Sequence, residues 1–384
     1  MKKIVLAILL AGLIQKASAT HIVGGEIMYQ YLSTSNGLKN YRVTMYLYID
    51  CINGAAGAIS SDNEALFNVF KTSNQALQTN LCKTVARTGP VTVSDLNYKC
   101  IKNKPSACVD KYTYVTTMSL PANTRYLITF ERCCRNKTIN NIVDAENTGA
   151  TYFTEINTAL NNSSPFFKSL PPNFLCTNAP LKFDHSAMDA DGDSLVYELF
   201  QPFDGAGTSP STASRPEYSD PGNLPHYPSN LVLWNPGYNT YFNQIDGSPT
   251  LTIDRRTGKL TLTPTVPNQY VIGIKVKEYR KGVLIGETKR DFQFNVADCN
   301  FDVVSSFFVP QKNCVGNPIT FNNRSQGGIR YYWNFGDTST LADTSNLKNP
   351  AYTYKNPGNY TITLVTSSSV CIDTSDYEIT VIPK

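Results

Sequence analysis

The stretch from Tyr331 to Thr366 constrains the fold of this chain more than any other, because it combines two alternating patterns with turn-forming residues. The side chains that share a face in each pattern are Tyr331, Trp333 and Phe335, and then Tyr360, Ile362 and Leu364. Such alternation places side chains on one face of a β-strand. Gly336-Asp337 and Pro357-Gly358 supply the turns. Two aromatic-rich strands bounded by turns predict one half of a β-sandwich.

The same residues, WNFGDT, YTY and PGNYTITL, resemble the PKD (polycystic kidney disease) domain, whose signature runs W-D-F-G-D-G, H-T-Y and P-G-x-Y-x-V-x-L. Asn334 and Thr338 stand where the family usually has Asp and Gly. The resemblance covers residues 299–384 and implies an immunoglobulin-like sandwich. It names a scaffold and no activity, because a fold does not imply a function.

Composition extends the all-β prediction to the whole chain. Of its 384 residues only 17% are charged, whereas Thr, Ser, Asn and Tyr are abundant. This mixture of strand formers and turn formers is typical of secreted all-β proteins. The length predicts two or three domains.

Residues 1–19 have the pattern of a signal peptide. Lys2 and Lys3 precede the apolar run Ile4–Ile14, and the small residues Ala17–Ala19 follow at the cleavage positions. The run is too short to span a bilayer. We therefore expect a secreted or outer cell-surface protein with no integral membrane span.

The chain that remains after cleavage has almost no net charge. Without Lys2, Lys3 and Lys16 it carries 31 basic and 30 acidic residues. A balance near zero gives no electrostatic reason to expect nucleic acid or an anionic membrane as a partner.

All ten cysteines follow the leader, at positions 51, 82, 100, 108, 133, 134, 176, 299, 314 and 371. An even number in an exported chain predicts disulfides. Cys314 and Cys371 flank strands of one sandwich, so we expect them to pair; closing a loop of about 57 residues would stabilise the fold by roughly 4 kcal/mol. For the adjacent Cys133 and Cys134 we expect separate partners, because a ring between neighbours is strained. A redox or metal role for them stays open.

The first region, residues 20–164, is predicted to be a β-sandwich-like domain. Its expected strands are Gly25–Tyr31, Tyr41–Asp50, Lys111–Leu120, Arg125–Glu131 and Ala150–Thr158. THIVGGE, a strand ending in D-C, CCRN and NSSPFF resemble the opening region of large secreted surface proteins of gliding bacteria. Those proteins commonly carry PKD domains and a gliding-motility-associated sorting domain. We expect either further C-terminal domains in the same chain or another route out of the cell.

The second region, residues 165–298, contains DADGDSLVYEL and LTIDRRTGKL, which resemble a cadherin-like or dystroglycan-type module. Between them lies a long loop, Phe203–Asn230, rich in Pro, Ser and Gly. Loops of this length are commonly functional. Its aromatic residues predict a ligand-contact surface for extracellular proteins or glycans, and they are Phe203, Tyr218, His226 and Tyr227. A loop with no ligand is the alternative.

Three carboxylates within five residues, Asp189, Asp191 and Asp193, predict a calcium site. Calcium prefers oxygen ligands, and the spacing is not that of an EF-hand because Gly192 stands at position 4. Asp254 is a weaker candidate ligand. The alternative for both places is a turn in which Asp side chains cap backbone amides.

Taken together, the sequence predicts tandem immunoglobulin-like β-sandwich domains stapled by disulfides, and a non-catalytic adhesion or interaction protein stiffened by calcium. No nucleophile motif, phosphate-binding glycine loop or spaced pair of acids favours an enzyme. Two alternatives remain. The chain can be an accessory, binding or spacer portion of a larger secreted polysaccharide- or protein-degrading enzyme, or a purely structural spacer.

Overall fold

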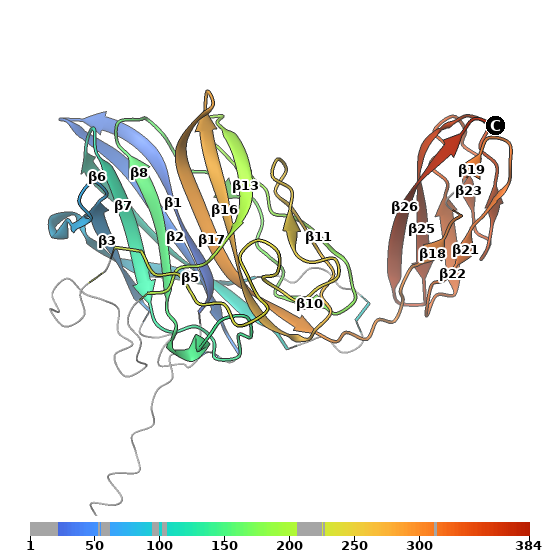
Figure 1. Ribbon diagram of the computed structural model, residues 1–384, viewed down its shortest axis with the longest axis horizontal. Helices are drawn as coiled ribbons and strands as arrows, with labels where there is room; N and C mark the ends of the chain where they lie inside the picture. Colours follow the sequence, from blue (N-terminus) through green and yellow to red (C-terminus); the bar gives the residue numbers. More distant parts are fainter. Residues whose placement is uncertain are drawn as a thin grey trace, which may run out of the picture. The chain divides into compact units, whose positions relative to one another are not determined.

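The computed structural model divides the chain into two compact units (Figure 1). It describes residues 22–52, 54, 62–93, 100–101, 106–205, 225, 227–310 and 313–384. Unit 1 comprises the described residues of Met1–Asp95 and Ser106–Asp298, and unit 2 those of Leu96–Pro105 and Cys299–Lys384. The expected signal peptide, residues 1–19, lies outside the described residues. Both units consist of β-strands, which confirms the all-β prediction.

Unit 1 holds strands β1 to β17. They are β1 (Ile22–Ser35), β2 (Leu38–Asp50), β3 (Glu64–Lys71), β4 (Ala76–Leu77), β5 (Lys83–Thr92), β6 (Val109–Pro121), β7 (Arg125–Arg132), β8 (Ala150–Asn157), β9 (Phe166–Phe167), β10 (Phe174–Cys176), β11 (Leu181–Asp184), β12 (Ala187–Met188), β13 (Ser194–Phe200), β14 (Thr252–Ile253), β15 (Lys259–Leu262), β16 (Asn268–Arg280) and β17 (Val283–Ala297). Two short 3-10 turns, Thr79–Leu81 and Ala145–Asn147, accompany them.

The expected strands Gly25–Tyr31 and Tyr41–Asp50 are confirmed, and both are longer than predicted. They form a hairpin in which β1 pairs with β2 as far as Ser35 and Leu38. Asn36 and Gly37 make the turn, both with positive φ. This two-residue Asn-Gly turn matches the twist of the flanking strands, so the ladder continues up to it.

One large sheet forms the frame of unit 1, in the order β13-β16-β17-β1-β2-β6-β5-β3-β7-β8. β5 carries the sheet from one layer to the other: Lys83–Ala86 pairs with β3, and Arg87–Thr92 pairs with β6. β8 then packs against β1 and β17. The sheet therefore folds back on itself and encloses its core as a sandwich does.

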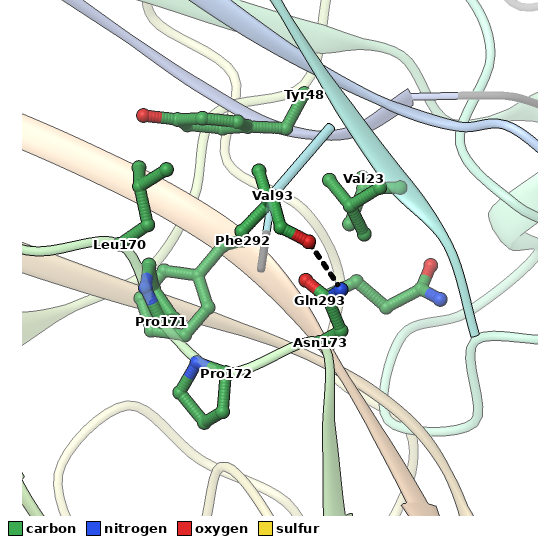
Figure 2. Close-up of a pocket in the computed structure, with 10 residues that line it drawn as sticks. Val23, Tyr48, Val93, Leu170, Pro171, Pro172, Asn173, Phe292 and Gln293 are labelled. Carbon is green, nitrogen blue, oxygen red and sulfur yellow. Dashed lines mark hydrogen bonds between the residues drawn. The ribbon is translucent and has the colours of Figure 1, made fainter. Parts of the chain in front are cut away.

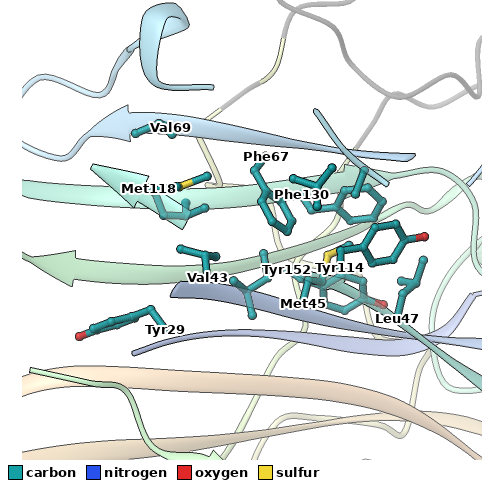
Figure 3. Close-up of a cluster of buried hydrophobic side chains, with 14 of the residues drawn as sticks. Tyr29, Val43, Met45, Leu47, Phe67, Val69, Tyr114, Met118, Phe130 and Tyr152 are labelled. Atoms are coloured by element: carbon teal, nitrogen blue, oxygen red, sulfur yellow. The ribbon is translucent and has the colours of Figure 1, made fainter. Parts of the chain in front are cut away.

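The core between the layers is aromatic and aliphatic, and Figure 3 shows its side chains pointing toward one another. Val43, Met45 and Leu47 alternate along β2 and are fully buried. Phe67 from β3 and Phe130 from β7 meet them from the other layer. The period-two pattern of Tyr41–Asp50 is therefore sufficient to identify the buried face of β2 from the sequence alone.

The boundary expected between residues 164 and 165 is wrong, because both regions share the large sheet. β1 pairs with β17 in the register Gly24↔Phe292 and Gly25↔Asp291. A Cβ atom on Gly24 would lie 2.3 Å from the carbonyl oxygen of Asp291 and 2.7 Å from the Cα of Phe292. Only glycine permits this approach, so the two regions are joined by backbone contact.

Two buried ion pairs hold the same junction. Arg290 of β17 binds Glu26 of β1 at 2.6 Å, and Tyr48 donates to the same carboxylate at 2.7 Å. Arg135 binds Asp291 at 2.6 Å, and both side chains are at most 3% exposed. Charges buried this deeply persist only when they are paired and hydrogen-bonded.

Unit 2 holds the remaining strands in smaller sheets. They are β18 (Phe307–Phe308), β19 (Asn313–Cys314), β20 (Ile319–Thr320), β21 (Asn322–Asn323), β22 (Arg330–Asn334), β23 (Thr344–Ser345), β24 (Ala351–Tyr352), β25 (Gly358–Ser367) and β26 (Ile372–Ile382). The largest sheet has the order β19-β26-β25-β22-β23. Trp333 is fully buried at its centre, and its indole nitrogen donates to the carbonyl oxygen of Leu347 at 2.9 Å.

The turn after β22 shows why the WNFGD residues occur together. Gly336 has φ +69°, and a Cβ there would lie 2.3 Å from the carbonyl oxygen of Thr361. Asp337 accepts bonds from Ser339 and from the Tyr352 hydroxyl, and these bonds lower the pKa of its carboxyl group. The glycine allows close packing and the aspartate ties the turn to the opposite side of the sandwich.

The expected disulfide between Cys314 and Cys371 does not form. Cys314 pairs with Ile382 at the end of β26, whereas Cys371 directly precedes the first residue of that strand. Eleven residues of strand separate the two ends, roughly 35 Å at the usual rise per residue. The cysteines flank the same strands, as expected, but at opposite ends of the sandwich.

Other cysteines are bonded. Cys51 and Cys108 join the end of β2 to the start of β6, with their Cα atoms 5.4 Å apart. Cys133 and Cys134 bond to each other, contrary to the expectation of separate partners. Cys176 and Cys299 are also in the disulfide form.

Gly24→Ala should destabilise unit 1 as a whole. The added methyl group meets the backbone of β17, and overpacking of this kind costs about 1–3 kcal/mol. We expect one cooperative transition to shift in chemical denaturation, with amide protection lost together in β2 and β16. Gly37→Asn is the control, because its turn has open space and asparagine tolerates positive φ. Separate transitions for β2 and β16 would contradict a single unit.

Candidate functional sites

Three of the four predicted metal ligands lie together between β12 and β13. Asp189, Asp191 and Asp193 each offer an oxygen within 4.8 Å of the others. The Asp189 Oδ1 atom accepts from the backbone nitrogens of Asp191 at 3.0 Å and Asp193 at 2.8 Å. Gly192 has φ +82°, which lets the chain turn tightly around the cluster.

A fourth carboxylate, Glu278 of β16, faces the same cluster and was missed from the sequence. It pairs in register with Leu195, close to the aspartates, and is fully buried. Asn162 donates to its Oε1 atom at 2.8 Å, whereas its Oε2 atom has no hydrogen-bond partner. Desolvation and the nearby charges of Asp189 and Asp193 raise the pKa of Glu278 to about 8. The pKa shift shows how strongly the surroundings oppose a fourth negative charge.

Arg280 balances part of this charge. Its Nε and Nη2 atoms donate to the Asp193 carboxylate at 2.8 and 2.5 Å, which lowers the pKa of Asp193. The Oδ2 atom of Asp189 is buried and has no hydrogen-bond partner. Asp189 Oδ2 therefore remains without a partner beside the carboxyl group of Asp193, and Glu278 contacts Asp193 from β16. Such oxygens suit a hard cation, since calcium takes carboxylate ligands.

Asp254 is not part of this group. Its Oδ1 atom accepts from the Arg256 nitrogen at 2.9 Å and from the Thr257 nitrogen and hydroxyl at 2.8 and 2.9 Å. These bonds lower the pKa of Asp254. Asp254 therefore caps the backbone of a turn, as the alternative to the metal-ligand prediction had it, and its prediction as a metal ligand is corrected.

The predicted contact loop is only partly visible. Tyr218 and His226 lie outside the described residues. Phe203 packs edge-on against Phe153, with ring centroids 4.9 Å apart, and Tyr227 packs against Phe70 at 5.8 Å. These two rings contribute to packing within unit 1, and ligand contact by the loop stays a prediction.

A groove near the sheet edge was not predicted. It has a volume of about 360 Å³ and is bounded by β13, by β14 and by Tyr241. Tyr241 and Phe242 are 71% and 75% exposed. The Asn239 side chain accepts from both of their backbone nitrogens, at 3.1 and 2.8 Å, so the turn that carries the two rings is hydrogen-bonded.

The charged residues that line the groove are Glu198 and Arg255, and further cations lie beside them. Glu198 binds Arg255 at 3.0 Å, Lys275 at 3.4 Å and Lys277 at 2.8 Å. Burial opposes ionisation of Glu198, yet Lys277 and Lys275 hold its pKa below the ordinary value. Glu287 also interacts with Lys275 and Lys277 and pairs with Lys289 at 2.9 Å. Arg255 and the three lysines thus share two carboxylates, which leaves the area attractive to anions.

Two further places are too closed or too small to hold a ligand. The pocket of Figure 2 has a volume of about 20 Å³, and Asn173 crosses its wall to donate to the Val93 carbonyl at 2.9 Å. That space fits about one water molecule. His185 is fully buried among Phe167, Phe183 and Phe292, and desolvation lowers its pKa. It is a neutral core residue.

Comparison with known proteins identifies a PKD domain within unit 2. Residues 304–381 match the family model for the PKD domain. This confirms the resemblance found at WNFGDT, YTY and PGNYTITL. PKD domains are typical of extracellular and surface proteins, where they serve in adhesion or interaction. The cadherin-like resemblance of residues 165–298 is not confirmed by the family model, which begins at residue 304.

Solved structures give weaker similarities. The PKD1 domain of Vibrio anguillarum Epp is 21% identical, covers 21% of this chain and 95% of its own, and has a TM-score of 0.19. Extracellular domains 3–5 of Drosophila OTK are 8% identical to this chain. The match covers 92% of this chain and 99% of theirs, with a TM-score of 0.18. Latent PorU from Porphyromonas gingivalis is 10% identical to this chain. The match covers 94% of this chain and 34% of the PorU chain, with a TM-score of 0.20. These TM-scores are too low to assign a function. No curated protein matches this chain.

The part of the chain that the structure describes contains no helix long and apolar enough to cross a membrane.

Replacing Arg280 should destabilise the acidic cluster in the absence of added cations. Arg280→Met removes the partner of Asp193, a side chain only 5% exposed, at a cost of about 2 kcal/mol. A lower melting temperature in chelator is the expected result. Arg255→Met is the control, because that guanidinium is 69% exposed and an exposed pair contributes about 1 kcal/mol or less. Equal shifts for the two variants would show that the cluster needs no balancing charge.

Proposed function

We propose that this chain is an exported, non-catalytic adhesion or interaction protein, in which unit 1 binds a ligand and the PKD domain extends or presents it. The observation that carries the proposal is the groove beside the exposed Tyr241 and Phe242 rings. Aromatic rings held on a hydrogen-bonded turn lose little conformational entropy on binding. The disulfides support export, because such bonds persist in oxidising compartments.

The chemistry of the groove favours a glycan that carries carboxylate or sulfate groups. Tyr241 offers a ring face for stacking, and Arg255 is largely exposed next to it. Lys275 and Lys277 add positive charge beyond what Glu198 neutralises. A neutral glycan would contact the ring and make no use of the excess positive charge around Glu198. This groove replaces the Phe203–Asn230 loop as our first choice of contact surface.

The contact surface can be tested with an array of acidic glycans, neutral glycans and acidic peptides. We expect binding to acidic glycans that weakens with salt, since exposed charges are screened at about 10 Å in 0.1 M salt. Tyr241→Ala together with Phe242→Ala should reduce the affinity at least about tenfold, a loss of about 1.4 kcal/mol.

Two variants complete this design. Leu341→Ala, at a fully exposed position in unit 2, should leave binding unchanged. Arg255→Gln should lower the affinity for acidic glycans and leave any weak neutral binding as it is. Binding that survives loss of both rings would remove the groove from consideration, and exclusive binding to acidic peptides would replace the glycan.

We also propose that calcium binds the acidic cluster and stiffens unit 1. Asp189, Asp191 and Asp193 would hold the ion, with the orphaned Asp189 Oδ2 atom among its ligands, and the nearby Glu278 carboxylate would add negative charge beside it. Calcium supplies the positive charge that Arg280 alone does not.

Calcium should therefore raise the melting temperature of the intact protein. For a dissociation constant of about 10⁻⁴ M, calcium at about 10 mM adds roughly 2.7 kcal/mol by mass action. Glu278→Gln keeps an oxygen but loses the charge, so it should remove most of the shift. Asp254→Asn is the matched control and should retain the full shift. Identical melting curves in calcium and in chelator would contradict the site and favour a proton shared by Glu278 and Asp193.

The proposal also states that this chain is not an enzyme. Glu26 and Asp291 are buried and paired with Arg290 and Arg135, so they are not available as general acids in a cleft. Turnover of a polysaccharide or protein by the purified chain would overturn this part of the proposal.

A further inference from the structure

Unit 2 includes a short segment from a distant part of the chain. Cys100 and Ile101 belong to this unit together with Cys299–Lys384. The carbonyl oxygen of Cys100 accepts from the Asp302 nitrogen at 2.7 Å, and Ile101 bridges to Phe301. The segment is therefore added to the sandwich by backbone hydrogen bonds, as a strand would be.

The segment brings one cysteine to another. Cys100, Cys371 and Val303 form a buried cluster, with the two cysteines 7% and 5% exposed. The Cys100 thiol donates to the carbonyl oxygen of Ile372 at 3.5 Å, and the Cys371 side chain lies within hydrogen-bonding reach of the same thiol. Ser368 fixes Cys371 from the other side by accepting from its backbone nitrogen at 3.1 Å.

We propose that Cys100 and Cys371 form a disulfide in the exported protein, which closes the β25–β26 turn onto the inserted segment. Both are thiols in the structure, whereas Cys51, Cys108, Cys133, Cys134, Cys176 and Cys299 are in disulfides. A compartment that oxidises those six supplies the conditions for this pair as well. Their shared burial against Val303 holds the two sulfur atoms together.

The bond would form by exchange with a small disulfide such as oxidised glutathione. One thiolate attacks it and releases one glutathione thiol, and the second protein thiolate then displaces the other. Two protein thiols are oxidised and the glutathione disulfide is reduced to two thiols, so electrons and protons balance. Burial is the main cause that raises the pKa of the Cys100 thiol to about 11, and the neighbouring Cys371 contributes to the same shift. Exchange should thus be fast in the unfolded chain and slow once unit 2 has closed.

Peptide mapping of the full chain, exported to an oxidising compartment, tests the proposal. Thiols are blocked with iodoacetamide in denaturant without reductant, and the digest is analysed by mass spectrometry. We expect a peptide pair joined through Cys100 and Cys371, lighter by two hydrogens than the two peptides with free thiols. In Cys371→Ser the Cys100 peptide should be alkylated, and in Cys314→Ser the link should persist.

Refolding gives a measurement that does not depend on the variants. Reduced full-length chain, refolded with oxidised and reduced glutathione, should form the link, whereas chain folded first and oxidised afterwards should form it at least about tenfold more slowly, because few of its thiols ionise near neutral pH. Alkylation of both cysteines in the exported chain, or bonds from either to another cysteine, would overturn the proposal.

Discussion

The pairing of β1 with β17 is the interaction on which unit 1 depends. It brings residues near 25 to residues near 291, and it requires the missing side chain of Gly24. The ion pair Glu26–Arg290 joins the same two strands, and Arg135–Asp291 ties the segment after β7 to β17. Losing one partner of such a pair leaves a buried charge and typically costs about 3–5 kcal/mol. The junction therefore accepts one register, in which both charges are matched.

This junction also explains how far sequence reasoning could go. The strands of Tyr41–Asp50 and Lys111–Leu120 were predicted to within three residues at each end, because alternation is a local pattern. The PKD domain was found for a similar reason, since its turn residues are close in sequence. Pairing between β1 and β17 has no local signal. A boundary at residue 164 was therefore placed between two sequence resemblances where the sheet in fact continues.

In the candidate sites, too, residues that are close in sequence could be predicted and residues brought together by strand pairing could not. Asp189, Asp191 and Asp193 were visible as a cluster because they are neighbours in sequence, whereas Glu278 joins them only through the register of β13 and β16. The failed pairing of Cys314 with Cys371 has the same origin. Flanking positions show which strands a cysteine borders, but only the strand direction shows at which end it lies.

The position of β17 at the end of unit 1 has a consequence for synthesis. β1 emerges first, yet its partner on one side follows after more than two hundred and fifty residues. Contacts so distant in sequence make folding slow, since a long loop must close before they form. Until then β1 exposes a glycine-lined edge to the surrounding solution. β1 therefore lacks one of its two neighbouring strands until nearly all of unit 1 has been synthesised.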